Sequence, residues 1–146
     1  MTLLMMPNAE ARRARYNREA VLSATPVRLL TMLYDRLLLD LNRAEAAQVD
    51  ENWGVASENL LHAQAIISEL TTSLNVEAWN GAEGLFALYT YVSTALMRAN
   101  THRDVARTQE SIALLEPLRL TWHEAAASLP SQPVETSPTG GALGFG

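Results

Sequence analysis

Cysteine is absent from the 146 residues, and so is lysine, since all 11 basic residues are arginine. The first absence excludes disulfides, thiol nucleophiles and thiolate metal sites. The second excludes Schiff-base chemistry on a lysine amine. Aromatic residues make up only 6% of the chain, against 48% for all hydrophobic residues. This balance favours helices packed through Leu and Ala over a sheet rich in Val and Tyr.

A surplus of positive charge and long apolar runs are missing too. The formal net charge is -5, and a negative protein has no overall field that attracts phosphates, so we expect no nucleic-acid partner. No apolar run approaches the roughly 18 residues of a membrane span, and the apolar start of the chain has no basic region before it. We therefore expect no signal peptide and no membrane insertion.

What the sequence does contain is four stretches with apolar residues spaced by three and four, a pattern typical of amphipathic helices. They cover about residues 26–48, 53–74, 82–100 and 105–126. Thr25 and Pro26 suit the N-cap and the first position of the first helix. We expect Asp50 and Asp104 to cap the second and fourth helices, and Asn100 to end the third in a left-handed conformation.

Short loops between helices force neighbouring helices to run antiparallel. The sequence therefore predicts an all-α protein, an antiparallel up-down four-helix bundle over residues 25–128. An N-terminal arm, residues 1–24, precedes it, and a Pro/Gly-rich tail, residues 129–146, follows it. We expect the arm to be flexible and the tail to be disordered, because the tail has too little apolar area to fold. Pro117 should kink the fourth helix or open one backbone hydrogen bond.

The sequence shows no set of residues suited to a metal or a cofactor. A di-iron bundle needs two Glu-x-x-His pairs, whereas Glu58 and His62 are four apart, have no second pair, and are expected to form a solvated surface pair. His102 and His123 have no carboxylate that helical spacing places beside them on an inward face. No glycine-rich phosphate loop follows a strand. We expect no catalytic residue, no metal and no cofactor, and hence no enzyme.

The first and third helices carry more apolar residues than one buried stripe requires. The surplus residues are Met32, Tyr34, Leu38 and Leu39 in the first helix and Leu88, Tyr91 and Met97 in the third. Surplus apolar surface of this kind indicates a dimer interface or a groove for a partner. A small bundle that buries wide helix faces gives the same pattern, and periodicity alone does not decide between these interpretations.

Residues 16–37 resemble the start of the flagellin chaperones, the flagellar secretion chaperone FliS family. The shared pattern is a Tyr, a Val, Ala-Ser/Thr-Pro opening a helix, and then Met-Leu-Tyr/Phe-Asp. Later blocks match the family in the same order, at 63–74, 85–91, 96–104 and 115–122, so the resemblance covers about residues 16–126. Two departures stand out: Arg36 replaces a usual Gly, and Asn75 replaces a common Asp.

The resemblance implies a bacterial cytoplasmic chaperone without catalysis. Its apolar groove would bind the disordered C-terminal segment of flagellin, prevent premature polymerisation and keep the client competent for export, with a component of the flagellar export gate as a further partner. The alternative is a helical homodimer with a structural or regulatory role.

Nine residues are candidates for client binding: Tyr16, Val21, Leu29, Leu30, Leu33, Tyr34, Leu88, Tyr91 and Leu96. The resemblance places Tyr16 and Val21 in a hinge-like lid over the groove. Each of the helical candidates has a core position as its other interpretation, and for Leu33 the core is the favoured one.

Overall fold

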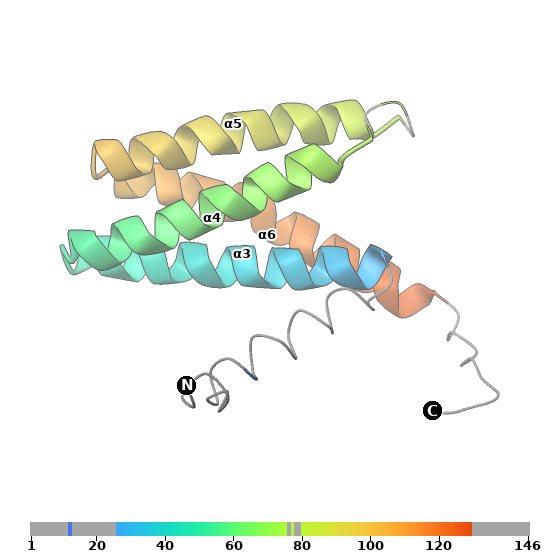
Figure 1. Cartoon of the computed structure of the whole chain (residues 1–146), viewed down its shortest axis with the longest axis horizontal. Coiled ribbons are helices and arrows are strands. Elements are labelled where there is room, and N and C mark those ends of the chain that lie inside the picture. The colour runs from blue at the N-terminus through green and yellow to red at the C-terminus, as the bar shows by residue number, and fades with distance from the viewer. Residues whose placement is uncertain (1–11, 13–25, 76, 78–79, 130–146) are drawn as a thin grey trace, which may run out of the picture.

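The computed structural model describes residue 12, residues 26–75, residue 77 and residues 80–129. The described chain contains four long α-helices and no strand, as the sequence predicts (Figure 1). They are α3 (Pro26–Val49), α4 (Trp53–Ser73), α5 (Ala82–Thr101) and α6 (Val105–Ser128). None of these helices combines the length and apolar character needed to cross a bilayer.

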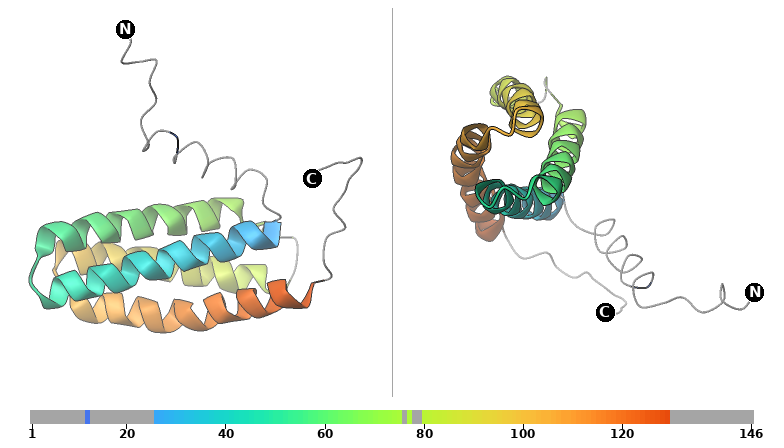
Figure 2. Two further views of the ribbon diagram at one scale, coloured as in Figure 1. Left: turned by 90° about the horizontal axis from the view of Figure 1, so that it is seen from below. Right: turned by 90° about the vertical axis from the view of Figure 1, so that its left-hand side faces the viewer.

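The helices form a ring in which each packs against the next and α6 packs back against α3. Seen along the bundle, α3 and α5 face each other across the ring, as do α4 and α6 (Figure 2). Consecutive helices are antiparallel because their connections are short. One end of the bundle therefore gathers the starts of α3 and α5 and the ends of α4 and α6 (Figure 1).

The predicted apolar stripes meet in the centre of this ring. The residues with at most 1% of their surface exposed include Leu37, Leu41, Leu60, Ile67, Val92, Leu96 and Leu115. Burying one such side chain stabilises the fold by about 1.5–3 kcal/mol. Alanines without exposed surface, among them Ala44, Ala63 and Ala99, lie between these larger side chains.

Two of the predicted helix ends are wrong. Asn52, not Asp50, caps α4, and its side chain accepts a hydrogen bond from the Val55 N–H at 3.3 Å. The chain turns at Glu51, which has a φ of 58°, so the cap falls two residues later than Asp50. Asn100 remains inside α5, and the left-handed residue is Arg103, with a φ of 52°.

The start of α6 agrees with the prediction, because Asp104 accepts a hydrogen bond from the Ala106 N–H at 3.1 Å. Helix α6 continues through Pro117, although proline has no N–H to donate to the carbonyl four residues earlier. Every residue of α6 that counts as fully buried precedes this proline; they are Thr108, Ser111 and Leu115. The second half of α6 is therefore the more loosely packed half.

A buried acid joins α3 to α4. The Asp40 side chain has no exposed surface, accepts a hydrogen bond from Arg36 Nε at 3.0 Å, and contacts His62 Nδ1 through its other oxygen. Glu58 and His62 are both exposed, as the sequence predicts, but the partner of His62 is Asp40 of α3 and not Glu58. A buried carboxylate needs such partners, because an unpaired charge in the core is strongly unfavourable.

A second polar contact crosses the centre of the ring. The hydroxyls of Tyr34 in α3 and Tyr89 in α5 lie 2.7 Å apart, and both residues are at most 2% exposed. The ring of Trp122 stands edge-on to that of Tyr34, with 6.2 Å between centroids and 64° between planes. Burial raises the pKa of both tyrosines; their shared hydrogen bond adds to the rise at Tyr89 and opposes it at Tyr34.

We predict that Tyr34→Phe and Tyr89→Phe each lower the free energy of unfolding by about 1–3 kcal/mol, because each leaves the other hydroxyl buried without a partner. The double variant should lose less than the sum of the two, since it leaves no orphaned hydroxyl. Urea denaturation of the four proteins measures this coupling. Strictly additive losses would show that the hydroxyl pair contributes nothing specific.

The tyrosine pair should also make the stability of the fold depend on pH in the alkaline range. Both phenols hold their protons more tightly in the folded than in the unfolded chain, so their contribution is complete below the unfolded pKa of about 10 and declines as the pH rises above it. Wild type should therefore lose stability as the pH rises above about 10, more steeply than the double phenylalanine variant.

Candidate functional site

An apolar groove of about 530 Å³ lies at the end of the bundle where α3 begins. Its first wall consists of Pro26, Leu29, Leu30 and Leu33 of α3. These residues stand at positions i, i+3, i+4 and i+7, which share one face of a helix. The sequence therefore builds this wall from a single helical stripe, next to the stripe that faces the core.

The other three helices complete the groove. Leu70 comes from α4 and Leu74 directly follows that helix; Leu85 and Tyr89 come from α5, and Trp122 comes from α6. Tyr89 is almost fully buried, so the tyrosine pair described above lies beneath the groove. The groove thus depends on all four helices meeting at this end.

Among the described residues no charged side chain lines the groove, and the more polar lining residues are Ser73, Asn75, Tyr89 and Trp122. Such a surface suits the apolar side chains of a ligand. The Trp122 indole N–H is buried near the Tyr34 hydroxyl, where it partly offsets the rise that burial causes in the pKa of that phenol, but it makes no hydrogen bond of regular geometry with the described residues. Those residues also contain no cluster of three or more His, Asp or Glu that could hold a metal ion.

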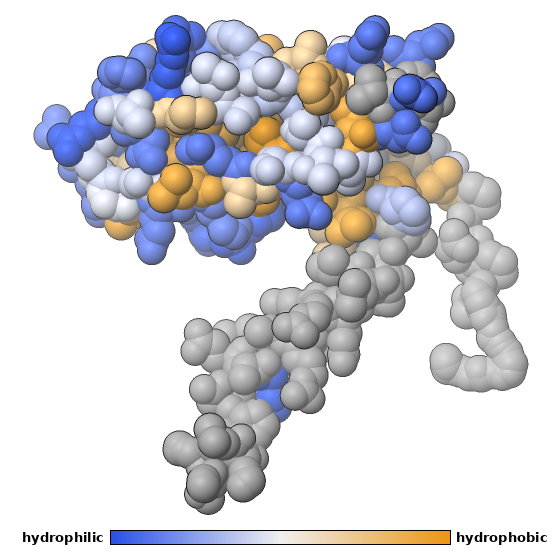
Figure 3. Space-filling view, turned by 45° about the horizontal axis from the view of Figure 1, so that its top comes forward, coloured by the Kyte–Doolittle hydropathy of each residue, from blue (hydrophilic) through white to orange (hydrophobic). Residues whose placement is uncertain are grey.

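Apolar surface also reaches the outside of the bundle. On the face seen in Figure 3 it forms separate patches between polar and charged atoms. The exposed large apolar residues are spread over all four helices and include Leu39, Leu61, Met97 and Leu120. The groove therefore differs from the rest of the surface in being continuous, apolar and concave.

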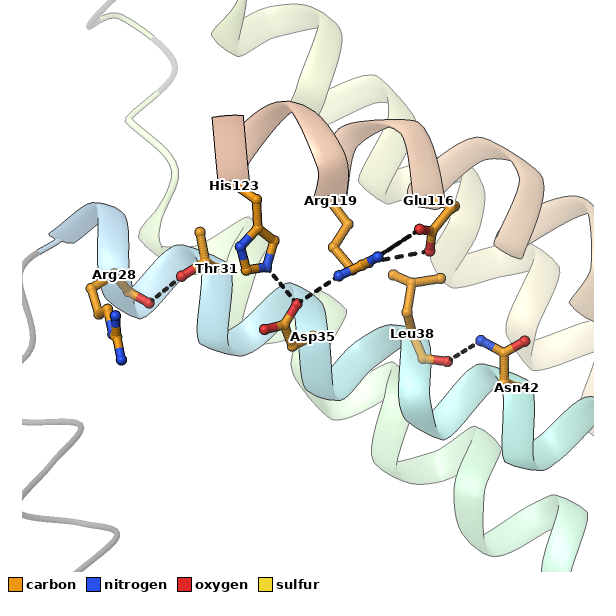
Figure 4. A network of polar contacts seen from close by, with 8 residues as sticks. All are labelled: Arg28, Thr31, Asp35, Leu38, Asn42, Glu116, Arg119 and His123. Carbon is orange, nitrogen blue, oxygen red and sulfur yellow. Dashed lines mark hydrogen bonds and ion pairs between the residues drawn. The ribbon is translucent and has the colours of Figure 1, made fainter. Parts of the chain in front are cut away.

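A polar contact that we call the α3–α6 latch holds α6 beside the groove (Figure 4). Asp35 Oδ1 accepts hydrogen bonds from Arg119 Nη1 at 3.1 Å and from His123 Nε2 at 2.7 Å. Arg119 also pairs with Glu116 at 2.8 Å. Partial burial by itself raises the pKa of Asp35, but the bonds from His123 and Arg119 outweigh it and hold this pKa below its usual value. Because Trp122 adjoins His123, the latch fixes the helical turn that carries the indole.

The structure brings three of the predicted site residues together, Leu29, Leu30 and Leu33, in the first wall of the groove. Leu33 is partly buried against the core as well as lining the groove. Leu88 packs against the core and does not line the groove. Tyr91 is 45% exposed on α5, and its hydroxyl donates to Glu110 at 2.6 Å, away from the groove.

Two predicted site residues, Tyr34 and Leu96, have no exposed surface and belong to the core. Tyr34 lies on the side of α3 that packs into the ring, and Leu96 lies on the inner stripe of α5, so neither presents its side chain to a partner in this structure. Tyr16 and Val21 fall outside the described residues.

Sequence reasoning assigned Leu70, Leu74, Leu85 and Trp122 to core stripes and did not identify them as groove residues. A signal for them was present, because each stands near the terminus of its stripe. In an antiparallel bundle the end of one stripe lies beside the start of the next. The last apolar residues of α4 and α6 and the first of α3 and α5 therefore had to meet at one end.

We predict that Asp35→Asn loosens the second half of α6, because it removes the charge that Arg119 and His123 share. Amide hydrogen exchange should become faster at residues 118–126 and stay unchanged near residue 108. Glu45→Gln is the matched control, since Glu45 accepts from Gln109 at 2.9 Å at the other end of the same α3–α6 contact.

Lowering the pH should also loosen the second half of α6 in the wild type. The lowered pKa of Asp35 gives the latch a contribution that is present above the unfolded pKa of about 4 and is lost as the pH falls through the folded value. The protection factors of residues 118–126, which compare each exchange rate with the intrinsic rate at the same pH, should fall on acidification in the wild type and not in Asp35→Asn. An equal fall in both proteins would show that the latch does not hold this segment.

The fold and the groove define a class of protein: a helical bundle with an uncharged apolar groove formed by all four helices. A solved structure described as the crystal structure of a flagellar chaperone from bacteria has the same fold. It superposes with a TM-score of 0.65 at 18% identity, over 81% of this chain and 99% of its own.

The chain belongs to the FliS family. The family described as Flagellar protein FliS matches residues 8–129, so the match begins earlier than the sequence blocks indicate. The flagellar secretion chaperone FliS of Escherichia coli (strain K12) is 35% identical over 111 residues, 75% of this chain and 82% of the relative. The protein of the same name from Bacillus subtilis (strain 168) is 32% identical over 113 residues, 77% and 84% of the two chains.

Proposed function

We propose that this protein is a flagellar export chaperone that holds the disordered C-terminal segment of flagellin in the apolar groove, in the bacterial cytoplasm and without catalysis. The observation that carries the proposal is the groove itself, an uncharged surface of about 530 Å³ built by four helices. Membership of a family whose relatives are named flagellar secretion chaperones supports it. A component of the flagellar export gate is the further partner that this role requires.

The chemistry of the groove fits a client that folds as it binds. An amphipathic segment places apolar anchors at helical spacing into such a groove, and each large anchor contributes about 1.5–3 kcal/mol when buried. Ordering a disordered client costs about 2–5 kcal/mol or more, so several anchors are needed. The volume lies within the roughly 300–1,000 Å³ typical of ligand pockets, which leaves room for more than one side chain.

Trp122 offers a hydrogen bond to the client backbone. Its indole N–H lies near the Tyr34 hydroxyl but makes no hydrogen bond of regular geometry with the described residues, and a buried donor is normally paired. A backbone carbonyl of the client is a suitable acceptor if the indole turns toward it. The latch beside Trp122 then positions the donor for this contact.

We predict that Leu30→Glu weakens binding of a peptide from the C-terminal segment of flagellin by more than about tenfold, because a charge replaces an apolar anchor. Leu39→Glu is the matched control: Leu39 is on the same helix, is 42% exposed and does not line the groove. Calorimetric titration measures both affinities, and circular dichroism checks that both variants are folded. Wild-type binding by a folded Leu30→Glu protein would place the client elsewhere.

The homodimer alternative makes a different prediction. A stable dimer needs its exposed apolar residues on one face, whereas here they are spread over four helices. Light scattering should give a monomer mass without peptide and a one-to-one complex with it. A dimer that the peptide does not dissociate would favour the structural role.

The lid also remains a proposal. Its candidates Tyr16 and Val21 precede Pro26, which lines the groove, so a short tether would hold them at an effective concentration of order millimolar. Deleting residues 1–20 should raise the association rate of the flagellin peptide, because the groove is closed for part of the time in the full chain. An unchanged rate in stopped-flow measurements would show that these residues do not compete with the client.

A further inference from the structure

A second hollow, of about 210 Å³, lies at the opposite end of the bundle, where α3 and α5 end and α4 begins. We call it the polar end pocket; its lining residues are Ala56, Leu60 and Ala99 together with Gln48, Trp53, Ser57, Asn100 and Arg103. Each of the last five side chains carries at least one hydrogen-bonding group. The polar end pocket is therefore chemically unlike the apolar groove.

Arg103 holds its guanidinium over the Trp53 ring and is not paired with a carboxylate among the described residues. Its guanidinium carbon lies 5.0 Å from the centroid of the Trp53 ring, in a cation–π contact. Its backbone has a φ of 52°, the left-handed conformation common just after a helix, and the next residue, Asp104, donates its N–H to the Ala99 carbonyl at 3.0 Å. No ion pair or hydrogen bond joins its guanidinium to another described residue, whereas Arg36, Arg107 and Arg119 each pair with a carboxylate. The N–H groups of Arg103 are thus available to an anion.

Gln48 offers a hydrogen-bond acceptor, whereas Arg103 offers donors. It is 3% exposed, and its Nε2 donates to the Ala99 carbonyl at 3.2 Å, which fixes the orientation of the amide. Its Oε1 is buried and accepts no hydrogen bond from the described part of the chain. Buried acceptors are nearly always paired in folded proteins, so a ligand that satisfies this pocket has to bring a donor.

Together these two residues select among ligands. Arg103 favours a carboxylate or a phosphate, since its N–H groups bind both. A doubly ionised phosphate ester brings no donor for Gln48, and a free amine is repelled by the guanidinium. A carboxylate with a peptide N–H beside it meets both requirements, and the last residue of a peptide is such a group. The volume is below the roughly 300–1,000 Å³ of pockets for drug-sized ligands, which suits one residue.

We propose that the polar end pocket binds the carboxyl terminus of a peptide. Arg103 donates to the terminal carboxylate, the Ser57 hydroxyl and Asn100 amide lie within the same pocket to complete its hydrogen bonds, and Gln48 Oε1 accepts from the N–H of the last residue. Capture of a chain terminus by a cluster of donors is a known mode of peptide recognition. The apolar groove is at the other end of α3, so a ligand of the polar end pocket leaves the groove open.

Four small probes test this assignment by NMR titration of the whole chain. N-acetylalanine carries the carboxylate and the N–H, N-acetylproline lacks the N–H, N-acetylalanine amide lacks the charge, and N-acetylaspartate α-methylamide carries its carboxylate on a side chain. We expect N-acetylalanine to shift the Trp53 indole and the amides of Asn100 and Arg103 saturably. The other three should bind about fivefold more weakly or worse, the loss expected for one missing hydrogen bond or more.

Three variants complete the test. Arg103→Gln should abolish the response to N-acetylalanine, and Arg107→Gln, which alters an arginine outside the polar end pocket, should not. Gln48→Met should remove the preference for N-acetylalanine over N-acetylproline. Equal responses to N-acetylalanine and its amide, or a wild-type titration by Arg103→Gln, would overturn the proposal. An equal or tighter response to the aspartate probe would overturn the assignment to a chain terminus.

Discussion

The hydrogen bond between Tyr34 and Tyr89 is the contact on which the groove depends. It joins α3 to α5 across the diagonal of the ring, where the two helices do not pack directly against each other. A hydroxyl in the core needs a partner, so the pair sets how far apart α3 and α5 lie at this level. Trp122 from α6 packs on Tyr34 and lines the groove above it. Three helices are thus fixed relative to one another directly beneath the groove.

The two ends of the bundle have opposite chemistry because of the antiparallel topology. One end collects Pro26, Leu74, Leu85 and Trp122, the apolar residues at the termini of their stripes. The other end collects the polar residues that follow the stripes of α3 and α5. On α3 the groove is lined by residues from Pro26 to Leu33 and the polar end pocket by Gln48, so the two are roughly 22–33 Å apart along this helix at 1.5 Å per residue. Sites at that distance without shared partners contribute independently to stability and binding.

The sequence was sufficient for the features that depend on one helix at a time. Its periodicity gave the extent of the four helices, and the loop lengths gave their antiparallel order. It did not distinguish which of two apolar faces of α3 would be buried, because α3 packs against both α4 and α6. Tyr34 therefore lies in the core although it lies outside the main stripe, and Leu30, on that stripe, lines the groove.

The spacing of apolar residues along each helix does not predict the contacts between helices, for the same reason. His62 has Glu58 four residues earlier in its own helix, and His123 has no carboxylate suitably spaced on an inward face, yet each histidine contacts an acid of α3, Asp40 and Asp35 respectively. Arg103 takes the left-handed conformation expected of Asn100 because α5 runs one residue further, to Thr101, before the chain turns. Spacing along one helix contains no information on these partners.

Arg36, which replaces the Gly usual in the family, has a structural role in this chain. A Gly at this position would leave the surface of α3 open, and Arg36 raises the question of whether it obstructs a client. Its side chain instead reaches along α3 to Asp40, with half of its surface exposed, and it does not line the groove. Asp40 has no exposed surface and therefore requires a cation or donor. Arg36 and the buried acid thus stabilise each other, and the apolar wall formed by Leu29, Leu30 and Leu33 remains clear of charge.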